Sequence, residues 1–243
     1  MTQNLPLVFI HGSGSCGGTW FFQTEAITGS IAVTLPGHPE GTPCGSIDEY
    51  TEWLARYCSE QGLARCILAG HSMGGGIAMT YALKYPSRLA GLICIATGAR
   101  LRVIPALIDT LKKNLDRDPE WCLDLVKPMY AALPSAVQDR ILNLLRHIPP
   151  ATLLNDFLCC DRFDIMEKVS GIAAPTLIIC GEEDVMTPLK YSRFLADRIP
   201  GSRLVTVPGA GHMVFLECPE QVNREITSFV SEVATSLTKE VIS

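Results

Sequence analysis

The sequence has few charged side chains and no long uninterrupted apolar run. Charged residues make up 19% of the 243 residues and hydrophobic residues 47%. The sequence contains no stretch of about 18 or more apolar residues, the length that a transmembrane helix needs. At the N-terminus no positively charged segment precedes an apolar core, as it would in a signal peptide. We therefore expect no signal peptide, no membrane span and a cytoplasmic protein.

Clusters of basic residues are also missing, and the formal net charge is -5. A nucleic-acid surface needs concentrated Lys and Arg to meet the phosphates. The composition therefore argues against nucleic acid as a partner.

The ten cysteines form no Cys-x-x-Cys pair. Cys159 and Cys160 are adjacent, which is not a chelate spacing, and Cys66, Cys94 and Cys180 fall in predicted strands, where a reduced cysteine behaves as a small hydrophobe. We expect reduced thiols, with neither a disulfide framework nor a metal site.

A glycine-rich loop over residues 11–20 follows the first predicted strand, Leu5–Ile10. It lacks the Gly-Lys-Ser/Thr ending of a phosphate-binding P-loop and a Gly-x-Gly-x-x-Gly opening a long helix. The sequence therefore predicts no cofactor.

The most informative stretch is Gly70-His71-Ser72-Met73-Gly74. An apolar run precedes it and a helical pattern follows, so that this Gly-x-Ser-x-Gly stands between a strand and a helix. That context is typical of a nucleophile elbow, in which a strained serine projects its hydroxyl from a tight turn that has no room for bulk at the flanking glycines.

Apolar strands alternate with helices along most of the chain, a pattern that predicts a parallel sheet covered on both faces. The expected strands are at residues 5–10, 31–35, 90–96, 175–181 and 203–207, together with the apolar run 66–69 that leads into the Gly-x-Ser-x-Gly turn. Between residues 98 and 161 the pattern changes to short helical pieces separated by prolines. We predict a core of residues 1–97 and 162–243 with an inserted helical cap at 98–161, called the cap segment below.

A serine hydroxyl needs a general base, and the base needs a group to orient it. Asp184 stands just past the fifth predicted strand, and His212 follows the sixth. The order Ser72, Asp184, His212 is the order of α/β-hydrolase triads, and all three residues follow strand ends. Glu183 is a rival for the orienting role.

With these motifs the chain resembles serine hydrolases of the α/β-hydrolase fold, of the esterase and lipase kind with a lid, from His11-Gly12 to His212. The resemblance implies that Ser72, Asp184 and His212 are catalytic and that the backbone N–H groups of Ser13 and Met73 form the oxyanion hole. The family usually opens with a two-stranded hairpin that this sequence lacks. We therefore expect a mainly parallel sheet of about six strands in the order second, first, third, fourth, fifth, sixth.

Other side chains receive structural interpretations. His11 is expected to pin its own loop, His71 to be a packed neighbour of the serine, and His38 and His147 to be surface or lid histidines. Seven large apolar residues are candidates for an acyl pocket, about half of them ordinary core: Trp20, Trp121, Met129, Phe157, Met186, Met213 and Phe215.

The leading functional hypothesis is hydrolysis of a small carboxylic ester through an acyl-enzyme. An acyl thioesterase or a carbon–carbon bond hydrolase would use the same residues, although His71 and Ser15 depart from the usual carbon–carbon hydrolase pattern. From another class, some members of this fold are ligand receptors or signalling partners with an intact triad.

The missing hairpin leaves the strand 31–35 at the edge of the sheet, and exposed edges invite pairing with another chain. This strand is short, so we expect a monomer, with an edge-strand dimer as the alternative.

Overall fold

The computed structural model describes residues 5–117 and 120–242, and within them the chain alternates strands with helices. The strands are β1 (Leu7–Ile10), β2 (Ile31–Val33), β3 (Cys66–His71), β4 (Leu89–Ile95), β5 (Thr176–Gly181) and β6 (Arg203–Val207). The helices outside the cap segment are η1 (Gly17–Trp20), α1 (Phe21–Ala26), α2 (Ile47–Glu60), α3 (Met73–Lys84), η2 (Pro86–Arg88), η4 (Val169–Gly171), α8 (Leu189–Arg198), α9 (Val214–Glu217) and α10 (Pro219–Ile242).

The described strands form one six-stranded sheet in the order β2-β1-β3-β4-β5-β6, which confirms the predicted order. All neighbouring strands are parallel, with Ile10 opposite Gly70, and Gly70 opposite Cys94. Since the strands run in one direction, the loops that follow β1, β3, β5 and β6 meet at a single edge of the sheet.

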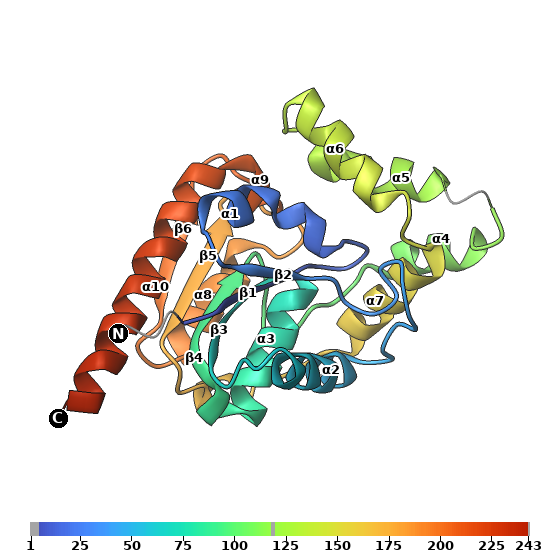
Figure 1. Cartoon of the computed structure of the whole chain (residues 1–243). Coiled ribbons are helices and arrows are strands. Elements are labelled where there is room, and N and C mark those ends of the chain that lie inside the picture. Colours follow the sequence, from blue (N-terminus) through green and yellow to red (C-terminus); the bar gives the residue numbers. More distant parts are fainter. Residues whose placement is uncertain (1–4, 118–119, 243) are drawn as a thin grey trace.

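Side chains alternate along β1, so that the sheet carries an apolar core on each face. Val8 and Ile10 pack with α2, α3 and α8, whereas Leu7 and Phe9 pack with α1 and α10. Figure 1 shows these two helical layers with the sheet between them. The continuous apolar strands of the sequence are explained by burial on both faces.

Strand ends differ slightly from prediction for identifiable reasons. Pro6 has no N–H to give to the ladder, so β1 starts at Leu7, although the Pro6 carbonyl still accepts from the Ile67 N–H at 2.8 Å. The edge strand β2 ends at Val33, and the Leu35 N–H donates to the His11 ring at 3.0 Å instead.

The predicted cap segment contains only helices among its described residues, apart from an isolated bridge between Arg100 and Asp164 at its base. These helices are α4 (Pro105–Lys113), α5 (Glu120–Val126), η3 (Lys127–Tyr130), α6 (Ser135–Leu145) and α7 (Pro150–Arg162). In Figure 1, α5 and α6 lie at the upper right, with α4 and α7 below them. The Ile165 N–H donates to the Ala99 carbonyl at 2.8 Å, so the two ends of the segment lie side by side. The exact domain boundaries stay a prediction.

Candidate active site

Ser72 occupies the turn between β3 and α3 with φ 52° and ψ -117°, a left-handed conformation that L-residues rarely adopt. Its carbonyl accepts from the Gly75 N–H at 2.9 Å and from the Thr97 hydroxyl at 2.7 Å, so neighbouring groups hold the strained backbone. A Cβ at Gly70 would collide with the Gly74 carbonyl, which is why this turn takes glycine. The predicted elbow geometry is present.

His212 lies in the loop after β6 and faces Asp184, which follows β5. The His212 Nδ1 is 2.9 Å from the Asp184 Oδ2. The Thr187 hydroxyl donates to the same oxygen at 2.8 Å, and the N–H groups of Met186 and Thr187 donate to Asp184 Oδ1 at 2.8 and 2.9 Å. Glu183 is exposed, so the structure pairs His212 with Asp184 and not with the rival carboxylate.

These hydrogen bonds set the charge of Asp184. Burial by itself would raise the pKa of the carboxyl, but the hydrogen bonds from His212 and Thr187 outweigh burial and lower the pKa below its ordinary value. Asp184 is therefore ionised at neutral pH, and its negative charge stabilises a positive charge on His212.

His71 is packed and hydrogen-bonded, as predicted, and the contacts are with His212. Its Nε2 is 3.0 Å from the His212 carbonyl oxygen, and the two ring centroids are 4.7 Å apart. Burial of the ring, and to a smaller extent the nearby His212 ring, lowers the pKa of His71 to about 3. The ring is therefore neutral at physiological pH, and its Nε2–H donates to the carbonyl of His212.

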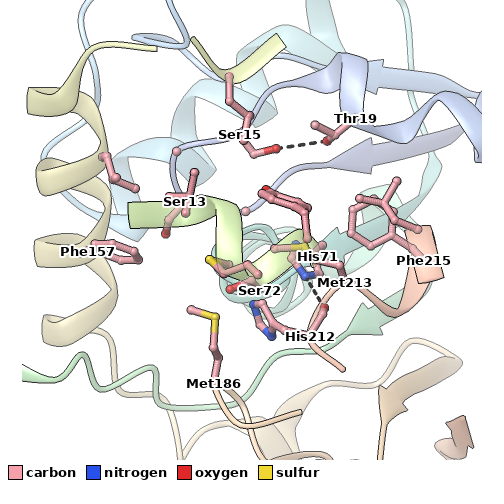
Figure 2. Close-up of a pocket in the computed structure, with 18 residues that line it drawn as sticks. Ser13, Ser15, Thr19, His71, Ser72, Phe157, Met186, His212, Met213 and Phe215 are labelled. Atoms are coloured by element: carbon pink, nitrogen blue, oxygen red, sulfur yellow. Dashed lines mark hydrogen bonds between the residues drawn. The ribbon is translucent and has the colours of Figure 1, made fainter. Parts of the chain in front are cut away.

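Ser72, His212 and Ser13 line one pocket, and Figure 2 shows the His212 ring beside Ser72. The cap segment supplies much of the apolar wall: Val126, Met129, Tyr130, Leu145, Leu153 and Phe157. The cavity measures about 30 Å³, which leaves room for about two water molecules. An acyl chain can enter only if wall side chains move.

Of the two predicted oxyanion donors, Ser13 lines this pocket, and Met73 directly follows the pocket residue Ser72. Met73 is the first residue of α3, where a backbone N–H has no partner within its own helix. Ser13 follows the His11-Gly12 pair at the carboxyl end of β1 and lines the pocket. Their role as donors stays a prediction.

Five of the seven apolar candidates line the pocket: Met129, Phe157, Met186, Met213 and Phe215. Trp20 is instead fully buried in the core between Phe9 and Phe215, and Trp121 packs among the cap helices. The pattern of apolar residues could not separate these two groups, because a large apolar side chain in the sequence is compatible with either place.

His11 holds its own loop in place, as predicted. Its Nδ1 lies 2.8 Å from the Gly12 carbonyl oxygen, and its Nε2 accepts a hydrogen bond from the Leu35 N–H. The prediction that His38 is a surface or lid histidine is wrong. Its side chain is fully buried, and its Nε2 lies 2.8 Å from the Oδ2 of Asp156, a residue of the cap helix α7. His147 is exposed, in keeping with its prediction.

Sequence reasoning missed Thr187 and Asp156. Thr187 had a local signal, since a hydroxyl three residues after a carboxylate can bond to it across a turn. Asp156 lies on the apolar side of α7, between the buried Leu153 and Cys160. A carboxylate at such a position indicates a buried partner, although only the structure identifies His38.

All ten cysteines are free, and burial raises the pKa of thiols such as Cys94, to about 12. Within residues 5–117 and 120–242, no three His, Cys, Asp or Glu side chains are grouped so that they could hold a metal ion. In the same part of the chain, no helix combines the length and the apolar character needed to cross a membrane.

This fold is that of an α/β hydrolase. Residues 7–225 match the sequence model of the alpha/beta hydrolase family, and the chain belongs to that family. The chain is 30% identical over 241 residues to a pimeloyl-[acyl-carrier protein] methyl ester esterase of Nitrosomonas europaea, an alignment that covers 90% of this chain and 94% of the relative.

Two other comparisons point to the same class. A putative carbamate hydrolase of Azorhizobium caulinodans is 26% identical over 243 residues, covering 94% of this chain and 92% of the relative. The solved structure of a thermophilic esterase superposes with a TM-score of 0.79 at 35% identity, covering 93% of this chain and 90% of that one.

Proposed function

We propose that the protein hydrolyses a small carboxylic ester, with Ser72 as nucleophile, His212 as general base and Asp184 as the residue that orients His212. One observation carries the proposal: the strained Ser72 shares its pocket with a histidine whose far ring nitrogen is held by a buried carboxylate. Holding Nδ1 in this way leaves Nε2 as the nitrogen that can accept a proton.

The reaction follows from these contacts. His212 Nε2 takes the proton of the Ser72 hydroxyl as Oγ attacks the ester carbonyl, and the resulting imidazolium is stabilised by Asp184. The same proton then passes to the leaving alkoxide, which departs as an alcohol and leaves the acyl group on Ser72. Water, deprotonated by His212, attacks the acyl-enzyme. The bond to Ser72 Oγ then breaks, His212 returns its proton to that oxygen, and the carboxylic acid leaves.

Negative charge develops on the carbonyl oxygen in both steps. The N–H groups of Ser13 and Met73 receive it, and the N-terminus of α3 adds a favourable dipole. Each such donor is worth about 3–4 kcal/mol in the transition state, so two of them account for a large part of the rate.

The substrate's acyl group meets a closed, mostly apolar wall. A short acyl chain needs the smallest movement of the cap side chains, which favours small esters. The similarity to a methyl ester esterase supports an ester over a thioester or a carbon–carbon bond, which the same residues could also cleave.

Esters of p-nitrophenol with acyl chains of two to twelve carbons test the proposal. Wild-type enzyme should turn over the shorter esters, and Ser72→Ala should lose several orders of magnitude in kcat while unfolding at the wild-type temperature. Ser87→Ala, which changes an exposed serine in η2, is the matched control and should keep full activity. A fluorophosphonate should add its mass to the peptide that contains Ser72.

The same panel separates the other class of function. A single turnover that leaves a stable acyl adduct on Ser72 would indicate a ligand receptor and would contradict the esterase. Retention of hydrolysis in Ser72→Ala would refute the mechanism outright. The cytoplasmic location and the monomeric state belong to this proposal too, supported by the free cysteines and by the shortness of β2.

A further inference from the structure

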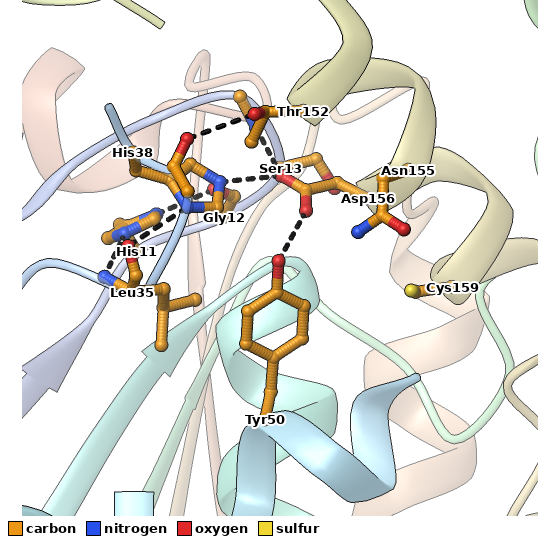
Figure 3. A network of polar contacts seen from close by, with 12 residues as sticks. His11, Gly12, Ser13, Leu35, His38, Tyr50, Thr152, Asn155, Asp156 and Cys159 are labelled. Carbon is orange, nitrogen blue, oxygen red and sulfur yellow. Dashed lines mark hydrogen bonds and ion pairs between the residues drawn. The ribbon is translucent and has the colours of Figure 1, made fainter. Parts of the chain in front are cut away.

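Asp156, on the cap helix α7, lies behind the loop that carries Ser13, and its side chain is fully buried. Its Oδ2 accepts from the Gly14 N–H at 2.9 Å and lies 2.8 Å from the His38 Nε2. Its Oδ1 accepts from the Tyr50 hydroxyl at 3.1 Å (Figure 3). A buried carboxylate is tolerated only with such partners.

The His38 ring joins this carboxylate to the core. Its Nδ1 lies 3.1 Å from the carbonyl oxygens of Leu35 and Pro36, which can only accept, so Nδ1 carries a hydrogen. Its Nε2 faces Asp156, so a second hydrogen lies between the ring and the carboxylate. His38 is therefore hydrogen-bonded on both sides of its ring, and it fixes Asp156 in place.

Two hydrogen bonds determine how Ser13 presents its N–H. The peptide between Gly12 and Ser13 is planar, so its carbonyl and its N–H point in opposite directions. The neutral His11 ring donates from Nδ1 to the Gly12 carbonyl at 2.8 Å, which fixes this first plane. The next plane contains the Gly14 N–H, and Asp156 fixes it.

The Gly14 backbone would not hold this orientation by itself. Its φ is +59°, in the left-handed region, and glycine moves freely between this region and others. The Leu153 side chain closes the space beside it, and the Ser13 hydroxyl lies 3.4 Å from the Cys160 Sγ. All three contacts on this side of the loop come from α7.

We infer that Asp156 is a positioning residue for the oxyanion hole: by accepting from the Gly14 N–H it holds the Ser13 N–H toward the carbonyl oxygen of the substrate. The inference rests on the proposed function. It also divides the cap segment, because α7 completes the hole and must stay docked during turnover. The movement that admits substrate then falls to the wall formed by α5, η3 and α6.

Two substitutions separate the acceptor from the charge. Asp156→Asn keeps an oxygen for the Gly14 N–H, whereas Asp156→Ala removes it. We expect Asp156→Ala to lower kcat by about 10- to 100-fold with little change in KM, short of the ~10²–10³-fold loss from deleting an oxyanion donor. Asp156→Asn should keep most of the wild-type kcat.

Phenylboronic acid supplies a second readout, since its adduct with a catalytic serine places an anionic oxygen in the hole. Its inhibition constant should rise in Asp156→Ala in proportion to the loss in kcat. The control is Thr152→Val, which removes another contact of α7 with the core, the hydrogen bond from the Thr152 hydroxyl to the Gly37 carbonyl at 2.9 Å. It should lower the unfolding temperature and leave both kcat and the inhibition constant unchanged.

Each result decides the question. If folded Asp156→Ala keeps wild-type kcat and boronate affinity while Ser72→Ala is inactive, the inference is wrong and the proposed function stands. Equal losses in Asp156→Ala and Asp156→Asn would assign the effect to charge and overturn the role of Gly14. If Asp156→Ala does not fold, the double variant Asp156→Leu with His38→Leu leaves no buried ion unpaired, and the same losses are expected from it.

Discussion

His71 should make the stability of the protein depend on pH in a way that one substitution removes. The ring is 4% exposed and donates to the His212 carbonyl. His71→Gln replaces the ring by an amide, which offers an N–H donor in place of the Nε2–H but does not titrate. The variant thus removes a buried base and keeps a possible partner for His212.

The magnitude follows from the pKa of about 3 in the folded protein, against 6.5 for an ordinary histidine. Between these values the unfolded chain binds a proton that the folded protein does not, so the stability falls as the pH falls. The contribution is fully present above pH 6.5 and is lost toward pH 3, at about 1.4 kcal/mol per pH unit. Two units below pH 6.5 the wild type should have lost about 2.7 kcal/mol on this account.

Urea unfolding followed by circular dichroism at several pH values measures this difference. The plot of unfolding free energy against pH should be steeper for the wild type than for His71→Gln, by one proton over the acidic range. Other buried groups, such as His11, contribute to both proteins and cancel in the difference. Parallel plots would refute the reasoning, because His71 would then be protonated equally in the folded and unfolded states.

Three further predictions concern the site and the sheet edge. Asp184→Asn should lower kcat by orders of magnitude, but by less than Ser72→Ala, because it disturbs only the orientation and charge of His212. Glu183→Gln should leave kcat unchanged. The reverse result in steady-state assays would show that Glu183, and not Asp184, orients His212. Met129→Trp should shift the chain-length preference toward shorter esters, since Met129 lines the pocket, while Trp121→Phe should leave it unchanged. Identical chain-length profiles for Met129→Trp and wild type would contradict the placement of Met129 in the wall of the acyl pocket. Light scattering at micromolar concentration should report a monomer, and a dimer that dissociates on substitution of the β2 residue Val33 by Lys would contradict it.

The sheet and the nucleophile turn could be predicted from local sequence. The four inner strands β1, β3, β4 and β5 are buried at every position and are almost wholly apolar, because a parallel strand covered on both faces has no side in contact with water. The turn at Ser72 could also be predicted. Glycine is required at position 70 because a Cβ there would collide with the Gly74 carbonyl, and at position 74 because a Cβ would collide with the carbonyl of Ile10 on the neighbouring strand β1. The positions of Asp184 and His212 just after predicted strands follow from these same local patterns, whereas the order of the strands was predicted from the resemblance to α/β hydrolases.

Partnerships between distant polar residues were decided by the tertiary structure. His38 and Asp156 are 118 residues apart, and neither has a neighbour in sequence that indicates the other. Their contact exists because α7 docks against the loop after β1, and this docking depends on the summed packing of the cap helices. The same packing puts Met129 in the pocket wall and Trp121 outside it, although both are apolar residues of the cap segment. The sequence pattern indicates which side chains are buried. Which buried side chains contact one another is determined only by the tertiary structure.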